Sequence, residues 1–125
     1  MDQVSTSAPG PRLTATWQRA GQDVLVLVTG GEKPHIGAVA AATPRPSLAD
    51  PSRLSATASV LAYVGHKEDE LAKRLAEFLA GRLGVRVVVA AGAHWDGLTP
   101  EQIAQVGVNA HELGELLLAA LRGEG

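Results

Sequence analysis

The sequence contains no cysteine and very few aromatic residues. The absence of cysteine among 125 residues excludes disulfides, thiolate nucleophiles and cysteine-ligated zinc, and it suits a reducing cytoplasm. Aromatic residues make up 3% of the chain, so a core must be built from Val, Leu, Ala and Ile. Every apolar run is far shorter than the roughly 20 residues of a membrane-spanning helix. We therefore expect no contact with a membrane.

A surplus of charge of one sign is also lacking. The formal net charge is −2, and the 11 Lys and Arg residues form no block of the kind that follows a nucleic-acid backbone. We expect no nucleic acid among the partners. Residues 1–11 have neither the basic head nor the apolar stretch of a secretory signal, which predicts a cytoplasmic protein. The same residues are rich in Ser, Pro and Gly and predict a flexible tail, followed by one folded domain over residues 12–122.

The first half of the domain has the patterns of β-strands. Residues 13–18 alternate apolar and polar side chains, which is typical of a half-buried strand. Residues 24–28 are continuously apolar, which predicts a central strand buried on both faces and paired with the first in a hairpin. Residues 38–42 predict a third strand. The prolines within residues 44–53 predict a surface loop, because proline has no amide donor.

The second half combines strands and helices. Strands are predicted at residues 55–64 and 85–90, and a helix at residues 68–83 carries apolar side chains at helical spacing. Thr99 and Asn109 each have the pattern of a helix N-cap, which predicts two further helices. The order of elements indicates an α+β fold: a mixed or antiparallel sheet of about five strands with two or three helices mainly on one face.

Two glycine-rich segments follow predicted strands, at residues 29–37 and 91–97. Adjacent glycines allow backbone N–H groups to turn toward an anion such as a phosphate, with Lys33 or His35 as a further donor. The alternative is that Gly30 and Gly31 form an ordinary tight turn.

A third candidate segment is Gly65-His66-Lys67, where a strand leads into a helix. The free N–H groups of a helix N-terminus attract a phosphate, and Lys67 adds a full positive charge. The alternative is a solvated helix start, in which Glu68 and Asp69 interact favourably with the helix dipole.

His35, His66 and His94 each lie at the boundary between a strand and a loop. Three converging imidazoles can hold a divalent metal, or they can donate hydrogen bonds to a ring or a phosphate. Their spacing matches no metal-binding motif, so both roles stay open. Asp96 is placed to pair with His94, but no nucleophile with an evident base accompanies them.

Taken together, these motifs resemble a known family. The string TGG-x-x-PHIG at residues 29–37, the His66-Lys67 pair, the AG-x-H string at residues 91–94 and the LTPEQI string at residues 98–103 resemble the LpdD-like prenylated flavin chaperones. That family includes the small D subunit of gallate decarboxylase systems. The resemblance extends over roughly residues 13–121.

The resemblance implies an accessory protein without catalytic activity of its own. Such a protein binds reduced prenylated FMN made by a UbiX-like flavin prenyltransferase and assists delivery to, or maturation in, a UbiD-like decarboxylase. The cofactor-binding residues that it implies are Thr29, Gly30, Gly31, Pro34, His35, Gly37, His66, Lys67, Gly92 and His94.

Two other functions remain open at this stage: a small metal-dependent enzyme that uses His35, His66 and His94, and a structural subunit of a decarboxylase complex. We also expect a homodimer, because a chain with long apolar strands can cover its exposed sheet edges by pairing with a second copy.

Overall fold

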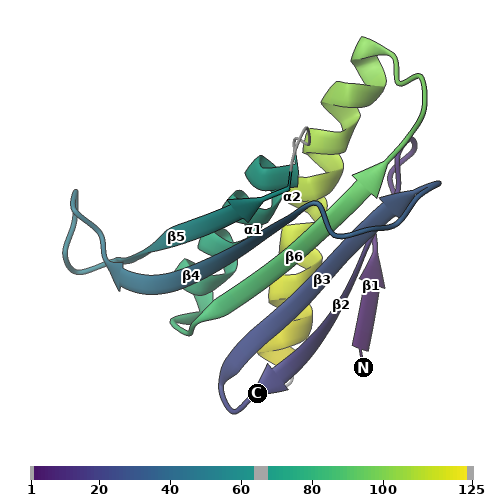
Figure 1. Ribbon diagram of the computed structural model, residues 1–125. Coiled ribbons are helices and arrows are strands. Elements are labelled where there is room, and N and C mark those ends of the chain that lie inside the picture. Colours follow the sequence, from purple (N-terminus) through teal and green to yellow (C-terminus); the bar gives the residue numbers. More distant parts are fainter. Residues whose placement is uncertain (1, 64–67, 124–125) are drawn as a thin grey trace.

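The computed structural model describes residues 2–63 and 68–123, which form one curved sheet covered on one side by two helices (Figure 1). The strands are β1 (Asp2–Ser5), β2 (Leu13–Ala20), β3 (Asp23–Gly31), β4 (Ala38–Pro46), β5 (Leu54–Ala62) and β6 (Val87–His94), and the helices are α1 (Glu68–Leu83) and α2 (Pro100–Gly123). The predicted α+β class is confirmed, with six strands in place of about five.

The strand order in the sheet is β1-β2-β3-β6-β4-β5. The β3–β6 pair is parallel and the other pairs are antiparallel, so the sheet is mixed. The β2–β3 hairpin is therefore present as predicted. Because β6 lies between β3 and β4, the connection from β3 to β4 must cross the end of β6. This crossing brings distant glycine-rich segments together.

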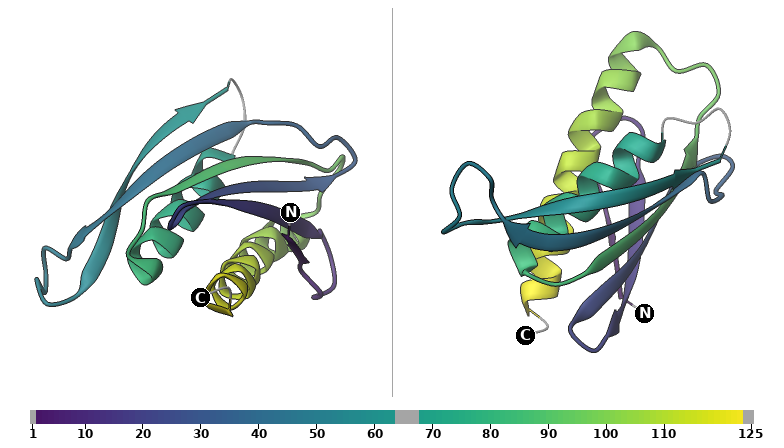
Figure 2. Two further views of the ribbon diagram at one scale, coloured as in Figure 1. Left: turned by 90° about the horizontal axis from the view of Figure 1, so that it is seen from below. Right: turned by 60° about the vertical axis from the view of Figure 1, so that its left-hand side comes forward.

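Both helices pack on the same face of the sheet, as the views in Figure 2 show. α1 contacts β4, β5 and β6, whereas α2 contacts β1, β2 and α1. The core between the layers consists mainly of Val and Ala from the strands and Leu from the helices. We name this side the helix face and the other side the open face. Neither of the two described helices combines the length and hydropathy needed to cross a bilayer.

The first residues do not form the tail that the sequence predicted. Asp2–Ser5 pairs with β2, and buried Thr6 accepts a hydrogen bond of 3.0 Å from the Leu13 amide through its hydroxyl. The Pro11 carbonyl accepts a bond of 2.6 Å from the Asn109 side chain. Glycine and proline in this segment thus form a connection docked on α2, because its polar groups find partners there.

The region after β6 forms one helix where the sequence predicted two. Thr99 does cap this helix: its hydroxyl accepts from the Gln102 amide, and the Gln102 side chain accepts from the Thr99 amide. Asn109 is not a second cap but a fully buried residue in the middle of α2. Its side-chain oxygen accepts a hydrogen bond from the Gln105 side chain, and its side-chain nitrogen donates one to the Pro11 carbonyl. The side chain therefore does not take hydrogen bonds away from the backbone of its own helix.

The proline-rich connection is shorter than predicted, because β4 extends to Pro46. β6 pairs with β4 only over residues 38–42, so Pro44 loses no ladder bond on that side. The turn that follows is held by its own side chains. Hydrogen bonds from the Ser52 hydroxyl and amide lower the pKa of Asp50 below its ordinary value.

Candidate functional site

The glycine-rich segments meet at one end of the sheet. Thr29, Gly30 and Gly31 form the last residues of β3 and pair with Gly92, Ala93 and His94 of β6. The β3–β4 connection then crosses β6, and the Gly37 amide donates to the Ala91 carbonyl over 2.8 Å. All the described residues that the resemblance implied as cofactor-binding therefore lie in one region. His66 and Lys67 lie outside the described residues.

Two of these glycines are required by close approach of backbone to backbone. A β-carbon on Gly92 would overlap the carbonyl oxygen of His35, where the connection crosses β6. A β-carbon on Gly31, which has a φ of 80°, would overlap the carbonyl oxygen of His94. Gly30 and Gly31 thus lie in a strand and form no tight turn. Their role in binding an anion stays a prediction.

His35 lies between a backbone carbonyl and a carboxylate. Its Nδ1 is 2.8 Å from the Lys33 carbonyl oxygen, and its Nε2 is 3.2 Å from Oε1 of Glu68. A carbonyl oxygen only accepts, so Nδ1 must carry the hydrogen. The Glu68 side chain is 8% exposed, so this pair is mostly removed from water.

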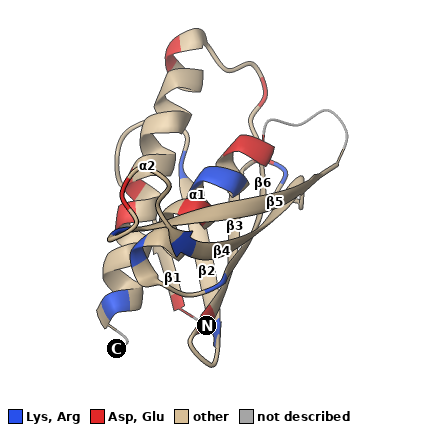
Figure 3. Ribbon diagram, turned by 90° about the vertical axis from the view of Figure 1, so that its left-hand side faces the viewer, with Lys and Arg blue, Asp and Glu red and all other residues tan. Residues whose placement is uncertain are grey.

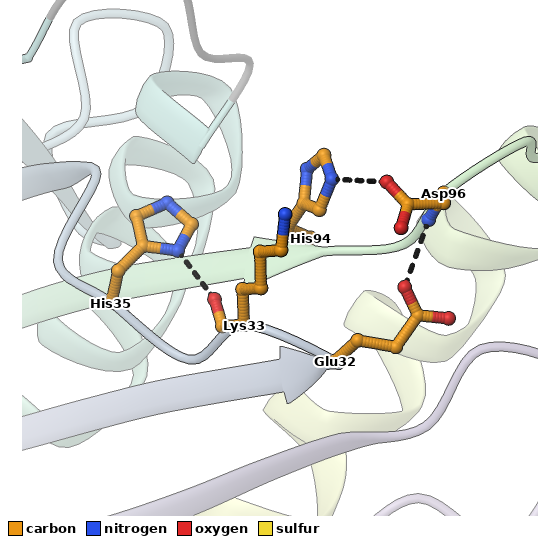
Figure 4. Close-up of polar contacts among 5 residues, drawn as sticks. All are labelled: Glu32, Lys33, His35, His94 and Asp96. Carbon is orange, nitrogen blue, oxygen red and sulfur yellow. Dashed lines mark hydrogen bonds and ion pairs between the residues drawn. The ribbon is translucent and has the colours of Figure 1, made fainter.

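His94 has a separate acidic partner, as predicted. Its Nε2 is 2.8 Å from Oδ1 of Asp96, and both side chains are well exposed. Glu32 supports the same loop, because its carboxylate accepts from the Asp96 amide over 3.2 Å and its own amide donates to the His94 carbonyl. Figure 4 shows these side chains at the ends of β3 and β6, with Lys33 between the two histidines in that view.

The histidines do not form a metal site in the part of the chain that is described. No group of three or more His, Asp or Glu side chains converges among residues 2–63 and 68–123. His35 and His94 instead each face a different carboxylate. The position of His66 lies outside these ranges.

A groove of about 940 Å³ opens beside this region, between the N-terminal halves of α1 and α2. Its walls are mostly apolar and include the aromatic rings of Phe78 and Trp95. Polar residues stand among them: Glu68, His94, Arg74 and His111. Since Glu68 contacts His35 and His94 also belongs to the glycine-rich region, the groove and the histidine pairs form one continuous candidate site.

Small residues on α2 keep the groove open. Gly107, Ala110 and Gly114 line it at spacings of three and four residues, which places them on one side of the helix. A β-carbon on Gly107 would meet no atom within 4 Å, whereas one on Gly114 would lie 3.3 Å from the Phe78 ring. The Arg82 guanidinium lies over the Phe78 ring, 5.0 Å from the ring centre, in a cation–π contact. The helices therefore diverge toward the N-terminus of α2.

Sequence reasoning missed the groove and the role of Glu68. Phe78 belonged to the predicted apolar stripe of α1, where it was expected to form core. The small residues of α2 at regular spacing were the available signal for a gap between helices. Nothing in the sequence indicated that Glu68, the first residue of a helix, would be buried against a histidine from another segment.

The chain is thus a small α+β domain with an apolar groove between its two helices. Residues 7–122 match the model of the prenylated flavin chaperone LpdD-like domain, and the chain belongs to this family, as the resemblance indicated. It is similar to Protein LpdD of Lactiplantibacillus plantarum, with 28% identity over 124 residues that make up 98% of this chain and 86% of that protein.

The fold itself is similar to a solved structure. That structure is described as a novel chaperone complex for yeast 20S proteasome assembly, and it matches with a TM-score of 0.57 and 14% identity over 98% of this chain and 96% of that chain. At this level of identity the likeness concerns the fold alone.

Proposed function

We propose that the chain binds reduced prenylated FMN and assists its delivery to, or maturation in, a UbiD-like decarboxylase. The observation that carries the proposal is the large apolar groove in a chain that belongs to the prenylated flavin chaperone family. Its volume of about 940 Å³ falls at the upper end of ordinary small-molecule pockets. A flavin with an additional prenyl ring is a large ligand, with an extended apolar ring surface and a polar phosphate-bearing tail.

The residues present fit such a ligand. Trp95 and Phe78 offer flat aromatic surface for the ring system, and the other apolar walls exclude water. Arg74 is the cation on the groove wall, and its guanidinium is 3.0 Å from the exposed Glu70 carboxylate. A flavin phosphate would compete with Glu70 for this guanidinium. The flavin supplies the electron-sink chemistry when it acts in the decarboxylase, and this chain binds, orients and shields it.

The implied flavin-binding residues and the groove meet at the end of β6. His94 is one of the implied flavin-binding residues and also lines the groove. Glu68 lines the groove as well and contacts His35, which is another of the implied residues. We propose that this junction receives the polar edge or the phosphate of the flavin. The exposed His94 is placed to donate a hydrogen bond directly, whereas His35, whose two ring nitrogens face Lys33 and Glu68, donates only if the flavin displaces one of these partners. Lys67, which precedes Glu68, then supplies the charge for the phosphate.

The partners follow from the same proposal. A UbiX-like prenyltransferase supplies the flavin, a UbiD-like decarboxylase receives it, and the transfer takes place in the cytoplasm. The chain has no catalytic role in this scheme, since it holds a cofactor for another protein. A homodimer is also part of the proposal.

The direct test is purification after coexpression with the prenyltransferase. We expect a stoichiometric modified flavin, identified by its absorbance and mass. Titration without binding of FMN or its prenylated form would overturn the proposal. Lys67→Ala should weaken binding by about 1.5–3 kcal/mol, the value of a charge-assisted contact. Lys73→Ala, an exposed charge on α1, is the matched control and should leave the dissociation constant unchanged.

A second variant tests the groove itself. Gly107→Phe places a ring in open space, so we expect the fold to persist and flavin binding to be lost. Val108→Phe adds the same ring on the neighbouring exposed position and should bind flavin normally. Unchanged affinity in Gly107→Phe would place the flavin elsewhere while leaving the family role intact.

A chelator separates the two histidine roles. If the histidines donate directly to the flavin, we expect a chelator to leave affinity unchanged. Loss of binding that one added divalent metal restores would assign them to a metal site instead.

A further inference from the structure

The two aromatic rings that line the groove differ in what already contacts them. The Arg82 guanidinium lies 5.0 Å from the centre of the Phe78 ring, and the centre of the His111 ring lies 6.5 Å from it. A ligand that stacks on Phe78 must therefore compete with these neighbours. Trp95 follows the end of β6, lines the groove and is partly buried against the core. Its indole is the larger aromatic surface and does not carry such a cover of cationic side chain.

The indole of Trp95 rests on the two glycines that end β3. A β-carbon on Gly30 would lie 2.9 Å from Cζ2 and 3.0 Å from Cη2 of the indole, and one on Gly31 would lie 3.1 Å from Cε2. Carbon atoms in ordinary contact are about 3.5–4.0 Å apart, so a side chain at either position would push the indole away. Gly30 follows Val26 and Val28 in the alternation of β3, which places the indole on the helix face, where the groove opens.

These strand ends are poorly suited to hold an anion. Gly30 pairs with Leu13 of β2 on one side and with Ala93 of β6 on the other, so its backbone groups serve the sheet. β6 contains no Lys or Arg, and the charged residue of β3 is Asp23, at the opposite end of the strand. Figure 3 shows strands with little charge beside helices that carry both signs. The glycine pair therefore has a steric role that anion binding does not require.

Glu32 fixes the backbone on both sides of Trp95. The Glu32 amide donates to the His94 carbonyl over 2.9 Å, and the Glu32 carboxylate accepts from the Asp96 amide over 3.2 Å. The second of these bonds depends on the Glu32 side chain. Because Glu32 is exposed, a substitution there removes this bond without disturbing the core.

We propose that Gly30, Gly31 and Glu32 are positioning residues, which fix the indole of Trp95 as the surface on which the flavin ring system stacks. This inference rests on the proposed function, because it names the residue that contacts the ring of the bound flavin. A side chain that is held in place before the ligand arrives loses little rotamer freedom on binding, which favours affinity. Stacked aromatic rings also gain more than the burial of their area provides.

The first test follows the two tryptophans of the chain by fluorine NMR after incorporation of fluorinated tryptophan. Trp17 is 5% exposed in the core and serves as the internal control, and Trp17→Phe assigns its signal. On addition of reduced prenylated FMN, made with the prenyltransferase, we expect the Trp95 signal to shift and the Trp17 signal to stay. An unchanged Trp95 signal at saturating flavin would overturn this inference and leave the proposed function intact. Absence of flavin binding would overturn both.

The second test measures affinity for reduced prenylated FMN. Trp95→Leu keeps an apolar side chain but removes the ring, and we expect the dissociation constant to rise about tenfold. Trp95→Phe keeps a smaller ring and should lose about threefold. Wild-type affinity in Trp95→Leu would show that the flavin ring does not stack on this residue.

The third test concerns positioning. Gly30→Ala is a poor choice, because its β-carbon would also lie 2.7 Å from the Arg12 carbonyl oxygen and would strain the fold. Glu32→Ala avoids this strain, and we expect it to broaden or split the Trp95 signal without flavin and to raise the flavin dissociation constant about threefold.

Two further variants control for charge and for the hydrogen bond. Glu32→Gln keeps an acceptor oxygen for the Asp96 amide and should restore both the Trp95 signal and the affinity. Glu101→Ala removes an exposed carboxylate from the first turn of α2 and should change neither. A wild-type Trp95 signal in Glu32→Ala, or equal changes in Glu32→Gln and Glu32→Ala, would contradict positioning through this bond.

Discussion

The two faces of the sheet are built from the same strands and differ in what covers them. On the helix face, Val26 and its neighbours are buried by α1 and α2. On the open face, Leu27 is flanked by Thr16 and Ala90 and is partly exposed. On β3 the helix face carries Val24, Val26 and Val28, while the open face carries the larger Leu25 and Leu27. This difference indicates that hydrophobicity alone does not tell a covered position from an uncovered one.

A second difference concerns the ligand site. The groove lies on the helix side, because it forms between two helices that diverge. The point where the β3–β4 connection passes Gly92 lies at one end of the open face. Gly92 belongs to that face because it follows Val88 and Ala90 in the alternation of β6. The His35–Glu68 and His94–Asp96 pairs lie between the groove and this crossing point. The groove on the helix side and the exposed leucines of the open face are therefore separate surfaces of the molecule.

The largest expected effect distinguishes the faces directly. Val26→Asp places an unpaired charge in the core and should lower the free energy of unfolding by about 3–5 kcal/mol. Leu27→Asp, one residue along, should leave the monomer folded, because its side chain reaches solvent. Denaturant unfolding of both variants at low protein concentration is the measurement. Equal destabilisation would mean that the open face is covered within one chain.

The next effect concerns the place where the chain crosses its own open face. Gly92→Ala brings a methyl group against the His35 backbone, which no rotamer change relieves, so we expect a loss of about 3 kcal/mol. Gly107→Ala, with open space around its β-carbon, should stabilise α2 by about 1 kcal/mol through helix propensity. Thermal unfolding of the pair tests this. A neutral Gly92→Ala would show that the crossing is loosely held.

The smallest effect compares the two histidine pairs. His35→Ala removes one partner of a mostly buried carboxylate and should cost about 1 kcal/mol, whereas the exposed His94–Asp96 pair contributes close to zero. We expect both variants to remain folded and both to bind flavin more weakly. Unfolding curves and flavin titration give the two readouts. A variant that binds flavin as the wild type does would remove that histidine from the site.

Much of the fold was predictable because its signals are local. The alternation of residues 13–18, the apolar run at residues 24–28 and the stripe of α1 each follow from the period of one element. The errors have a common origin. Asn109 resembles a helix cap and Pro44 resembles a loop residue until a partner from elsewhere, or the lack of a neighbouring strand, decides otherwise.

The candidate site was predictable in part. The motifs placed His35, Gly92 and His94 near strand ends, and the parallel pairing of β3 with β6 brings them together. Glu68 and the groove were not predictable, because they depend on how two helices cross and on which carboxylate faces a given imidazole. Such contacts join segments that are far apart in the sequence.

Most strands and the first helix could be read from the sequence alone, as could the apolar character of both faces of β3 and membership in a family recognisable by its glycine and histidine motifs. The three-dimensional contacts were needed to show that β1 and a single α2 form, which apolar face is covered, where the chain crosses β6, and that α1 and α2 leave a groove between them. The physical reason is that local periodicity follows from backbone geometry, which each residue carries with it. Burial and pairing depend on which distant segments meet.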